Sequence, residues 1–411
     1  MRQSSALRFR RASWRTLPSV TLLVTFWMMA PVAAAPDRGR AVVETTMRRF
    51  PDASDFGEWG YAYAYYLYGQ YLVHKRTGER RYLEYVIDWV DAHVDADGNI
   101  DVPIDELDRR MPGLLLLVLH AETAEPRYRR AAETIRRAFD THPRTSDGGF
   151  WHTSGEHASL RDPNKVDGKL WADGAFMAVP FLIEYGRTFP DGGASADEAV
   201  RQLLVYARHL QDPATGLLYH VYDETGRAAW LAPGTTHSRE FWCRAIGWYG
   251  TALIYTLDRL GDHPRRADLL AILGRLVPAL ERYQDPHTGR WFQVVDKGSH
   301  PANWTETSCS AMHSFVLARA VEAGYVPSRH GDAAARGYQG VLDRIALDAQ
   351  GMVILEATSK GTHVGDLDYY LARPRLPNWP HGLGAFLILH ELVPAPSDQA
   401  ASDRPLRRSP P

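Results

Sequence analysis

Apolar residues recur at steps of three and four through most of the chain, which is the period of a helix with one buried face. Glycines such as Gly78 and Gly324 follow two of these segments, where a helix commonly ends. No long stretch alternates between apolar and polar residues, so we expect an all-α fold with only short strands or extended pieces, such as 217–221 and 291–295. The pattern predicts helices at 60–76, 81–94, 112–122, 128–139, 196–211, 244–260, 266–284, 310–324 and 338–347.

A short turn motif separates the helical segments. It is clearest at 212–220 and 285–293, and looser copies lie at 95–100, 146–152 and 348–354. Its central glycines are Gly98, Gly149, Gly216, Gly289 and Gly351. They follow one another at about 50 to 75 residues, the length of two helices with their connections. The sequence therefore predicts an (α/α)6 barrel of six helical hairpins, with an open solenoid as the alternative. The aromatic residues and histidines after the turns are then expected at one rim.

The two ends of the chain differ in composition from the part between them. Several arginines precede the apolar run 17–35, which ends in small residues and is short for a membrane span. This predicts a signal peptide at 1–35 and an exported protein, periplasmic or secreted. Pro, Ser and charged residues fill 394–411 and predict a disordered tail. The barrel domain is expected at 37–393, without an internal linker.

The overall composition excludes several classes of partner. The chain has 411 residues, of which 45% are hydrophobic and 23% charged, with a formal net charge of −2. We therefore expect neither nucleic acid nor an anionic membrane surface as a partner. Motifs of hydrolase triads, zinc proteases and nucleotide enzymes are absent, so no metal and no cofactor is expected. An exported chain could join its two cysteines, Cys243 and Cys309, but buried free thiols are the preferred expectation.

The stretch 167–186 places one acid among apolar residues. Asp173 lies between Trp171 and the run 174–177. Burial favours the neutral form of a carboxyl group, so Asp173 could carry a proton and donate it to a substrate. An Asp in the first turn of a helix could equally act as a cap, and its pKa would then be lowered. The neighbouring residues leave both interpretations open.

Further polar residues follow the turns. Asp108 precedes an apolar helix and is either its cap or a second carboxylate facing Asp173. His152 and His220 each follow an aromatic residue at equivalent turns, which favours a shared cleft although a lone His is usually structural. The polar residues of 303–315 either cap a helix or line a pocket floor.

One predicted helix begins with an arginine between tryptophans. Trp242 precedes it, and Arg244 and Trp248 are four residues apart and share a helix face. Arg suits a carboxylate ligand and Trp suits the face of a sugar. The alternative is an arginine stacked on core aromatic rings.

Taken in order, eight segments resemble glycoside hydrolase family 105, the unsaturated rhamnogalacturonyl hydrolases, which are relatives of the family 88 unsaturated glucuronyl hydrolases. The resemblance covers about residues 58–392 and implies an (α/α)6 barrel. It places the catalytic acid on Asp173 and a second Asp on Asp108. The implied substrate contacts are Trp59 or Tyr61, His152, His220, Trp242, Arg244 and Trp248. The segments are ELDRRMPG, GGFWH, KLWADGAFMAVPFLIEYG, DPATGLLYHVYDE, SREFWCRAIGWYG, YQDPHTGRWFQVVD, NWTETSCSAM and GLGAFLILHEL.

The resemblance also implies a reaction. Polysaccharide lyases leave a 4,5-double bond on a terminal uronic acid, and one protonated acid can start its hydration. Asp173 would be this acid, kept protonated by Asp108, while Arg244 would neutralise the uronate. Thr153 and Cys243 depart from the family pattern. Thr153 bears on the identity of the sugar next to the unsaturated one, and Cys243 places a thiol near the site. The alternatives are an inverting glycosidase on saturated glycans that uses Asp108 and Asp173, and a catalytically silent carbohydrate-binding protein.

Overall fold

A computed structural model describes residues 37–153, 168–394 and 407–408. All of them belong to one compact unit, 35–411. The predicted signal peptide at 1–35 lies outside the described residues, as does the predicted tail except for Pro394 and the strand at 407–408. The described part contains thirteen α-helices, and none of them is both long and apolar enough to cross a bilayer.

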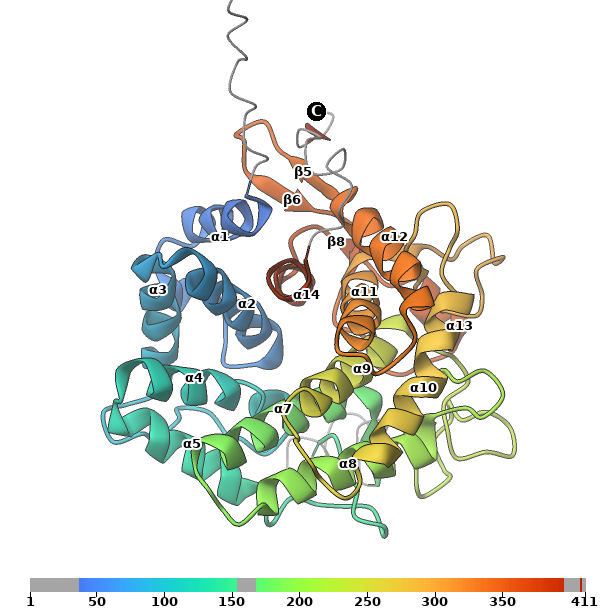
Figure 1. Ribbon diagram of the computed structural model, residues 1–411, viewed down its shortest axis with the longest axis horizontal. Coiled ribbons are helices and arrows are strands. Elements are labelled where there is room, and N and C mark those ends of the chain that lie inside the picture. Colours follow the sequence, from blue (N-terminus) through green and yellow to red (C-terminus); the bar gives the residue numbers. More distant parts are fainter. Residues whose placement is uncertain (1–36, 154–167, 395–406, 409–411) are drawn as a thin grey trace, which may run out of the picture. The chain divides into compact units, whose positions relative to one another are not determined.

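Twelve of these helices form two concentric rings (Figure 1). The inner ring consists of α2 (Tyr61–Thr77), α4 (Gly113–Thr123), α7 (Ala172–Thr188), α9 (Cys243–Leu257), α11 (Thr307–Glu322) and α14 (Pro380–Leu392). The outer ring consists of α1 (Arg38–Arg49), α3 (Arg80–Asp91), α5 (Pro126–Ala138), α8 (Ala194–Leu210), α10 (Arg266–Arg282) and α12 (Gly331–Leu342). Each inner helix contacts the next, and α14 contacts α2. The predicted (α/α)6 barrel is confirmed, and the open solenoid is excluded.

The sixth pair of helices differs from the hairpin that the sequence predicts. Five pairs join consecutive helices, whereas the last inner helix, α14, pairs with the first outer helix, α1. Arg76 at the end of α2 links the two, because it donates to Asp37 before α1 at 2.8 Å and to Glu391 in α14 at 3.0 Å. The two ends of the described barrel therefore close the ring.

The repeated turn docks on the outer ring. In four copies the central glycine has a positive φ, for example 68° at Gly289, whereas in the copy at 146–152 it is Gly148 and not Gly149. A Cβ atom on Gly289 would lie 2.3 Å from the carbonyl oxygen of Arg336 in α12. Gln284 holds this turn as well, because its amide donates to the carbonyls of Gly289 and Ala333. At Gly98, Gly216 and Gly289 the turn thus packs against the backbone of an outer helix.

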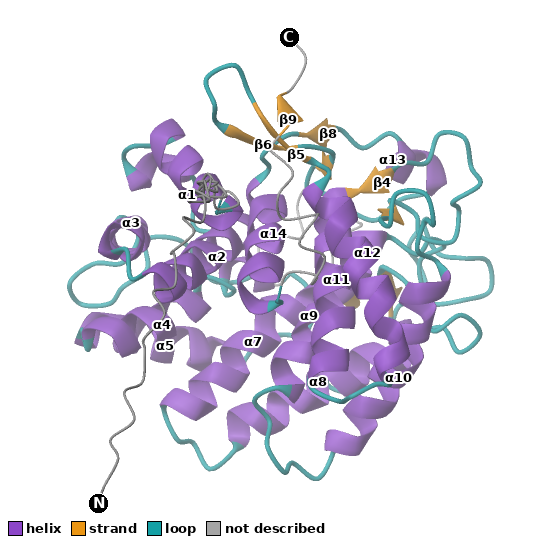
Figure 2. Cartoon of the chain, turned by 45° about the horizontal axis from the view of Figure 1, so that its top comes forward, coloured by secondary structure: helices purple, strands orange, loops and turns teal. Residues whose placement is uncertain are grey.

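Short strands connect the helices. The short helix α13 (Leu367–Leu371) lies between β7 and β8. The helix predicted at 338–347 ends at Leu342, because residues 345–347 form a strand that pairs with Val353–Leu355. This hairpin lies between α12 and α1 (Figure 2). The antiparallel pairs are β1 (Lys169–Trp171) with β2 (Val221–Asp223), β3 (Trp291–Phe292) with β4 (Thr305–Glu306), β5 (Ile345–Leu347) with β6 (Val353–Leu355), and β7 (Thr358–Ser359) with β8 (Arg375–Leu376); β9 (Arg407–Arg408) is parallel to β5.

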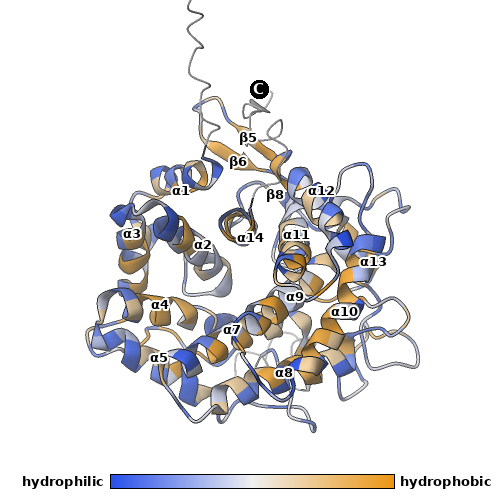
Figure 3. Ribbon diagram, viewed as in Figure 1, coloured by the Kyte–Doolittle hydropathy of each residue, from blue (hydrophilic) through white to orange (hydrophobic). Residues whose placement is uncertain are grey.

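The core lies between and within the rings. Every residue of α9 is buried, which explains why apolar residues surround that helix. Outer helices bury one face only, and Figure 3 shows polar residues on the outward side of α3 and α5. Pro180 lies inside α7, which continues through it to Thr188.

The two cysteines form a disulfide, so the expectation of free thiols is wrong. Cys243 begins α9 and Cys309 lies in the first turn of α11, and their Cα atoms are 5.7 Å apart. These helices are neighbours in the inner ring, a relation that sequence spacing does not reveal. His313 lies beside the bridge, and burial lowers the pKa of its imidazole to about 3.

Candidate active site

A cavity of about 230 Å³ lies near the amino-terminal ends of α2 and α7. Four of the predicted site residues line it: Tyr61, Asp108, His152 and Asp173. The remaining described lining residues are Glu106, Thr153, Trp171, Met177, Gly361, Thr362 and His363. Acidic, imidazole and aromatic groups therefore converge in one place, as expected for the rim of the barrel.

Backbone pairing brings the predicted residues together from distant parts of the chain. Four segments lie side by side: 106–107, 152–153, 169–172 and 220–223. The connecting hydrogen bonds run from Leu107 N to His152 O (3.1 Å), from His152 N to Lys169 O (3.0 Å) and from Ala172 N to His220 O (2.9 Å). Because α7 begins directly after β1, Asp173 is fixed beside His220.

Asp173 is surrounded by cationic and imidazole groups. Its side chain does not cap α7, since the cap residue is Trp171 and makes no side-chain hydrogen bond. His220 Nε2 lies 3.2 Å from Asp173 Oδ2, without the alignment of a hydrogen bond. Burial acts to raise the pKa of Asp173, but His220, His152 and Arg244 outweigh it and the pKa is lowered. The expectation of a raised pKa is therefore wrong for the protein without substrate.

The second predicted carboxylate has a cationic partner. Asp108 Oδ1 lies 3.4 Å from His152 Nε2, and the His152 ring stacks on Trp171 at 4.8 Å. Burial would lower the pKa of His152, but Asp108, Asp173 and Glu106 raise it overall. These acids thus favour the charged form of His152. The groups that lower the pKa of Asp173 are His220, His152 and Arg244, and the like charge of Asp108 is not among its main influences.

Tyr370, which the sequence did not indicate, completes a chain of contacts to Asp173. Its hydroxyl lies 2.7 Å from His220 Nδ1 and accepts a hydrogen bond from the Gly365 backbone. Burial raises the pKa of Tyr370 far above its ordinary value, so the hydroxyl keeps its proton. Burial also lowers the pKa of His220, although Asp173 opposes this, so the imidazole is neutral. Tyr370 therefore donates to Nδ1, which assigns the single ring proton to Nε2, facing Asp173.

Arg244 holds a loop and does not line the cavity. It is 1% exposed, and its guanidinium donates to the carbonyls of Ser359 (2.8 Å) and Lys360 (3.0 Å). Glu306 lies 3.7 Å from it, and the group stacks over Trp242 at 4.6 Å. Glu306 also caps α11, and Ser308 donates to Glu306, so this hydroxyl of the 303–315 segment serves the cap. The alternative of an arginine stacked on an aromatic ring describes this geometry.

Two predicted tryptophans belong to the core. Trp59 is 2% exposed, stacks on Trp89 at 5.5 Å and donates to the Arg109 carbonyl. Trp248 packs against Tyr65 and Phe176 inside the inner ring. Of the two aromatic residues considered near the start of α2, only Tyr61 lines the cavity.

Comparison with known proteins identifies the family. The sequence profile described as Glycosyl Hydrolase Family 88 matches residues 39–392. The chain belongs to this family.

Known proteins align with this glycoside hydrolase over most of its length. Unsaturated rhamnogalacturonyl hydrolase YesR of Bacillus subtilis is 25% identical over 86% of this chain and 95% of its own. A family 105 glycoside hydrolase structure from C. acetobutylicum is 30% identical, with a TM-score of 0.79 over 87% of this chain and 99% of the other. The unsaturated glucuronyl hydrolase structure from Bacillus sp. GL1 shares the fold at 17% identity, with a TM-score of 0.65 over 86% and 94%. The resemblance to families 105 and 88 is confirmed.

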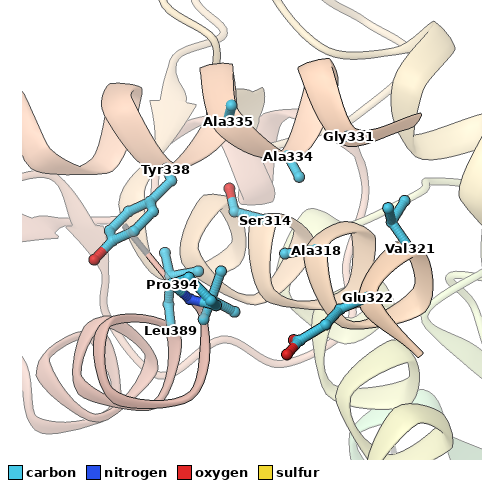
Figure 4. A pocket seen from close by; sticks show the side chains of 11 residues that line it. Ser314, Ala318, Val321, Glu322, Gly331, Ala334, Ala335, Tyr338, Leu389 and Pro394 are labelled. Carbon is cyan, nitrogen blue, oxygen red and sulfur yellow. The ribbon is translucent and has the colours of Figure 1, made fainter. Parts of the chain in front are cut away.

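A second cavity of this family 88 protein, of about 220 Å³, lies between α11, α12 and α14 (Figure 4). Its described lining is mostly small or apolar, and the hydroxyl of Ser314 is bound to the Ser310 carbonyl. Its one carboxylate, Glu322, is paired with Arg319 at 2.6 Å. It therefore lacks the convergent titratable groups of the cavity around Asp173.

Several cavity residues escaped the sequence analysis. Trp171 was noted only as an apolar neighbour of Asp173, yet it forms the aromatic wall of the cavity. Glu106 and Met177 carried no distinguishing signal. The loop 361–363 lies between β7 and α13, where no periodicity or motif marks it.

Proposed function

We propose that this glycoside hydrolase removes the 4,5-unsaturated uronic acid from the non-reducing end of oligosaccharides made by polysaccharide lyases, with rhamnogalacturonan or pectin fragments as the substrate class. The observation that carries the proposal is the buried Asp173, held between His220 and His152 in the cavity. The similarity to an unsaturated rhamnogalacturonyl hydrolase over most of both chains supports the same substrate class.

The reaction needs one acid that acts twice. The unsaturated ring is an enol ether, so Asp173 donates a proton to C4 while a water molecule adds at C5 and returns a proton to the carboxylate. The resulting hemiketal opens and releases the neighbouring sugar. This hydration does not require the separate nucleophile and acid of an ordinary glycosidase. The pairing of Asp108 with His152 is consistent with a supporting role for Asp108.

The pKa of Asp173 is lowered in the free protein, although a proton donor must be protonated. The substrate itself can reverse this shift. A uronate adds a negative charge near Asp173 and displaces water from the cavity. Both effects favour the protonated form of a carboxyl group. We infer that substrate binding raises the pKa of Asp173 and so prepares the proton donor.

This inference predicts two different pH profiles. The value of kcat/KM reports the free enzyme, in which the lowered pKa of Asp173 confines the protonated form to acidic pH. As pH rises, kcat/KM therefore falls early, whereas kcat, which reports the complex, falls at a higher pH. Initial rates across pH measure both profiles. Falling limbs of kcat/KM and kcat that coincide would contradict the inference. A methyl-esterified substrate carries no negative charge, so it should bring the two limbs closer together.

The Tyr370 hydroxyl sets the tautomer of His220. Tyr370→Phe removes the donor to His220 Nδ1, so the tautomer whose Nε2 proton faces the Asp173 carboxylate loses the hydrogen bond that favours it. We expect the falling limb of kcat/KM to move upward by about one pH unit, since the carboxylate loses a favourable interaction. Tyr249→Phe is the matched control, because it removes another buried hydroxyl, bound to the Leu203 carbonyl. An unmoved falling limb, together with an unchanged His220 ring ¹⁵N spectrum, would refute this role of Tyr370.

The function itself is tested with lyase-digested pectin. Loss of the enol ether absorbance, together with release of the neighbouring sugar, is the expected result. Cleavage of saturated oligosaccharides alone would favour an inverting glycosidase that uses Asp108 and Asp173. Binding without any product would favour a carbohydrate-binding protein. Fragments from pectin, ulvan and glycosaminoglycans, compared side by side, separate galacturonyl from glucuronyl substrates.

We also propose that the protein is exported. The disulfide between Cys243 and Cys309 supports this, because such bonds persist mainly in oxidising compartments. Fractionation of the source cells, followed by antibody detection, tests the proposal, and detection only in the cytoplasm would overturn it.

A further inference from the structure

We propose that the backbone N–H groups of Gly361 and Thr362 form the binding site for the carboxylate of the uronate. The ligand class is a planar carboxylate on a sugar ring. The identity of that sugar rests on the proposed function. The loop 361–363 then takes the role of binding the uronate, which the resemblance implied for Arg244.

Arginines bind three successive carbonyls at the start of this loop. Arg244 donates to the Lys360 carbonyl at 3.0 Å and to the preceding Ser359 carbonyl at 2.8 Å. Arg373 donates to the Gly361 carbonyl. Neither arginine lines the cavity, whereas Gly361 and Thr362 do. The arginines therefore lie behind the loop as seen from the cavity.

Peptide geometry then directs the N–H groups. In a planar trans peptide the N–H points opposite to the C=O of the same unit. Arg244 on the Lys360 oxygen thus turns the Gly361 N–H away from the arginine, and Arg373 on the Gly361 oxygen does the same for the Thr362 N–H. Within the part of the chain that the structure describes, neither N–H donates to a protein acceptor. Two adjacent donors without acceptors are the typical arrangement of a backbone anion site.

The carboxylates of the cavity lie outside the loop 361–363. Glu106, Asp108 and Asp173 line the cavity and repel a uronate, whereas residues 361–363 contribute no carboxylate. Each arginine also polarises the peptide it binds, which makes the N–H on the far side a stronger donor. The carboxylate would therefore be recognised by N–H groups, with the two guanidinium charges behind them.

Tyr61 adds a third donor at the same place. A Cβ atom on Gly361 would lie 4.0 Å from the Tyr61 hydroxyl, so the hydroxyl borders the loop. Burial, followed by the charge of Asp108, raises the pKa of Tyr61, and the hydroxyl keeps its proton. An O–H beside two N–H groups can satisfy both oxygens of a carboxylate.

The test observes the loop directly and does not depend on turnover. Protein labelled with ¹⁵N-glycine and ¹⁵N-threonine is titrated with D-galacturonate, with its methyl ester and with D-galactose. The Gly361→Ala and Thr362→Ser variants identify the two signals. We expect galacturonate to shift both amides and the two neutral sugars to leave them in place. Unmoved Gly361 and Thr362 amides at saturating galacturonate would overturn the proposal.

A pair of variants isolates the N–H group. Gly361→Pro removes the donor, whereas Gly361→Ala retains it, and its Cβ meets nothing closer than the Tyr61 hydroxyl at 4.0 Å. We expect the Kd for galacturonate to be about 10- to 100-fold higher in the Pro variant than in the Ala variant. Equal values would refute the site. Shifted amides without turnover of unsaturated substrate would leave the anion site standing and reject the proposed function, and turnover with unmoved amides would do the reverse.

Discussion

Replacing Asp173 with Asn is expected to lower kcat by about 10²- to 10⁴-fold on lyase-digested pectin, the range that general acid–base catalysis contributes. The amide cannot transfer a proton to C4 or accept one from water, although its size and hydrogen-bonding atoms resemble those of the acid. His220 and His152 would remain in place around it. The initial rate of loss of the enol ether absorbance measures the effect.

The control for this variant is an acid at an equivalent helical position outside the cavity. Asp268 lies in the first turn of α10, as Asp173 lies in the first turn of α7. Asp268→Asn should therefore leave kcat unchanged, and a thermal unfolding curve of each variant establishes that it is folded. Full activity of Asp173→Asn would remove Asp173 from the mechanism.

Removing the disulfide between Cys243 and Cys309 should lower the free energy of unfolding substantially. Cys243 and Cys309 are separated by 66 positions in the sequence, and cross-linking such a loop reduces the entropy of the unfolded chain. The loop-closure relation gives a stabilisation of about 4 kcal/mol at 25 °C. The Cys243→Ser/Cys309→Ser double variant should lose this amount in the free energy of unfolding, as measured by urea denaturation.

Reductant provides the matched comparison for the disulfide. Under denaturing conditions it should shift the transition of the wild type towards that of the double variant and leave the double variant unchanged. If the wild type gave the same unfolding curve with and without reductant, the two cysteines would not be bonded in solution. The loss should also loosen α9 against α11, the helices that begin beside Arg244 and Glu306.

Much of the barrel could be predicted because its signals are local. The three- and four-residue period gave most of the helices, and the turn glycines gave their grouping into pairs. The helix predicted at 338–347 extended too far, because the apolar residues 345–347 serve a strand instead. A short apolar run satisfies either structure, and only its pairing with Val353–Leu355 decides between them.

The site was predicted in part. Four predicted residues line the cavity: Tyr61, Asp108, His152 and Asp173. They could be predicted because the order of the motifs marked them together. Trp59, Trp242, Arg244 and Trp248 were equally prominent in the sequence but are buried behind the cavity or in the core. A residue type indicates what a side chain could bind and not the direction in which it points.

The sequence by itself determined the helical class, the repeated turns and the acid on which the chemistry is proposed to depend. The tertiary structure alone decided that α1 and α14 close the ring, that Cys243 bonds to Cys309, and that Asp173 has a lowered pKa. Periodicity and capping act between residues a few positions apart, so the sequence displays them. Ring closure, disulfide geometry and electrostatic shifts depend on distances between segments far apart in the chain, and those distances exist only after the helices have packed.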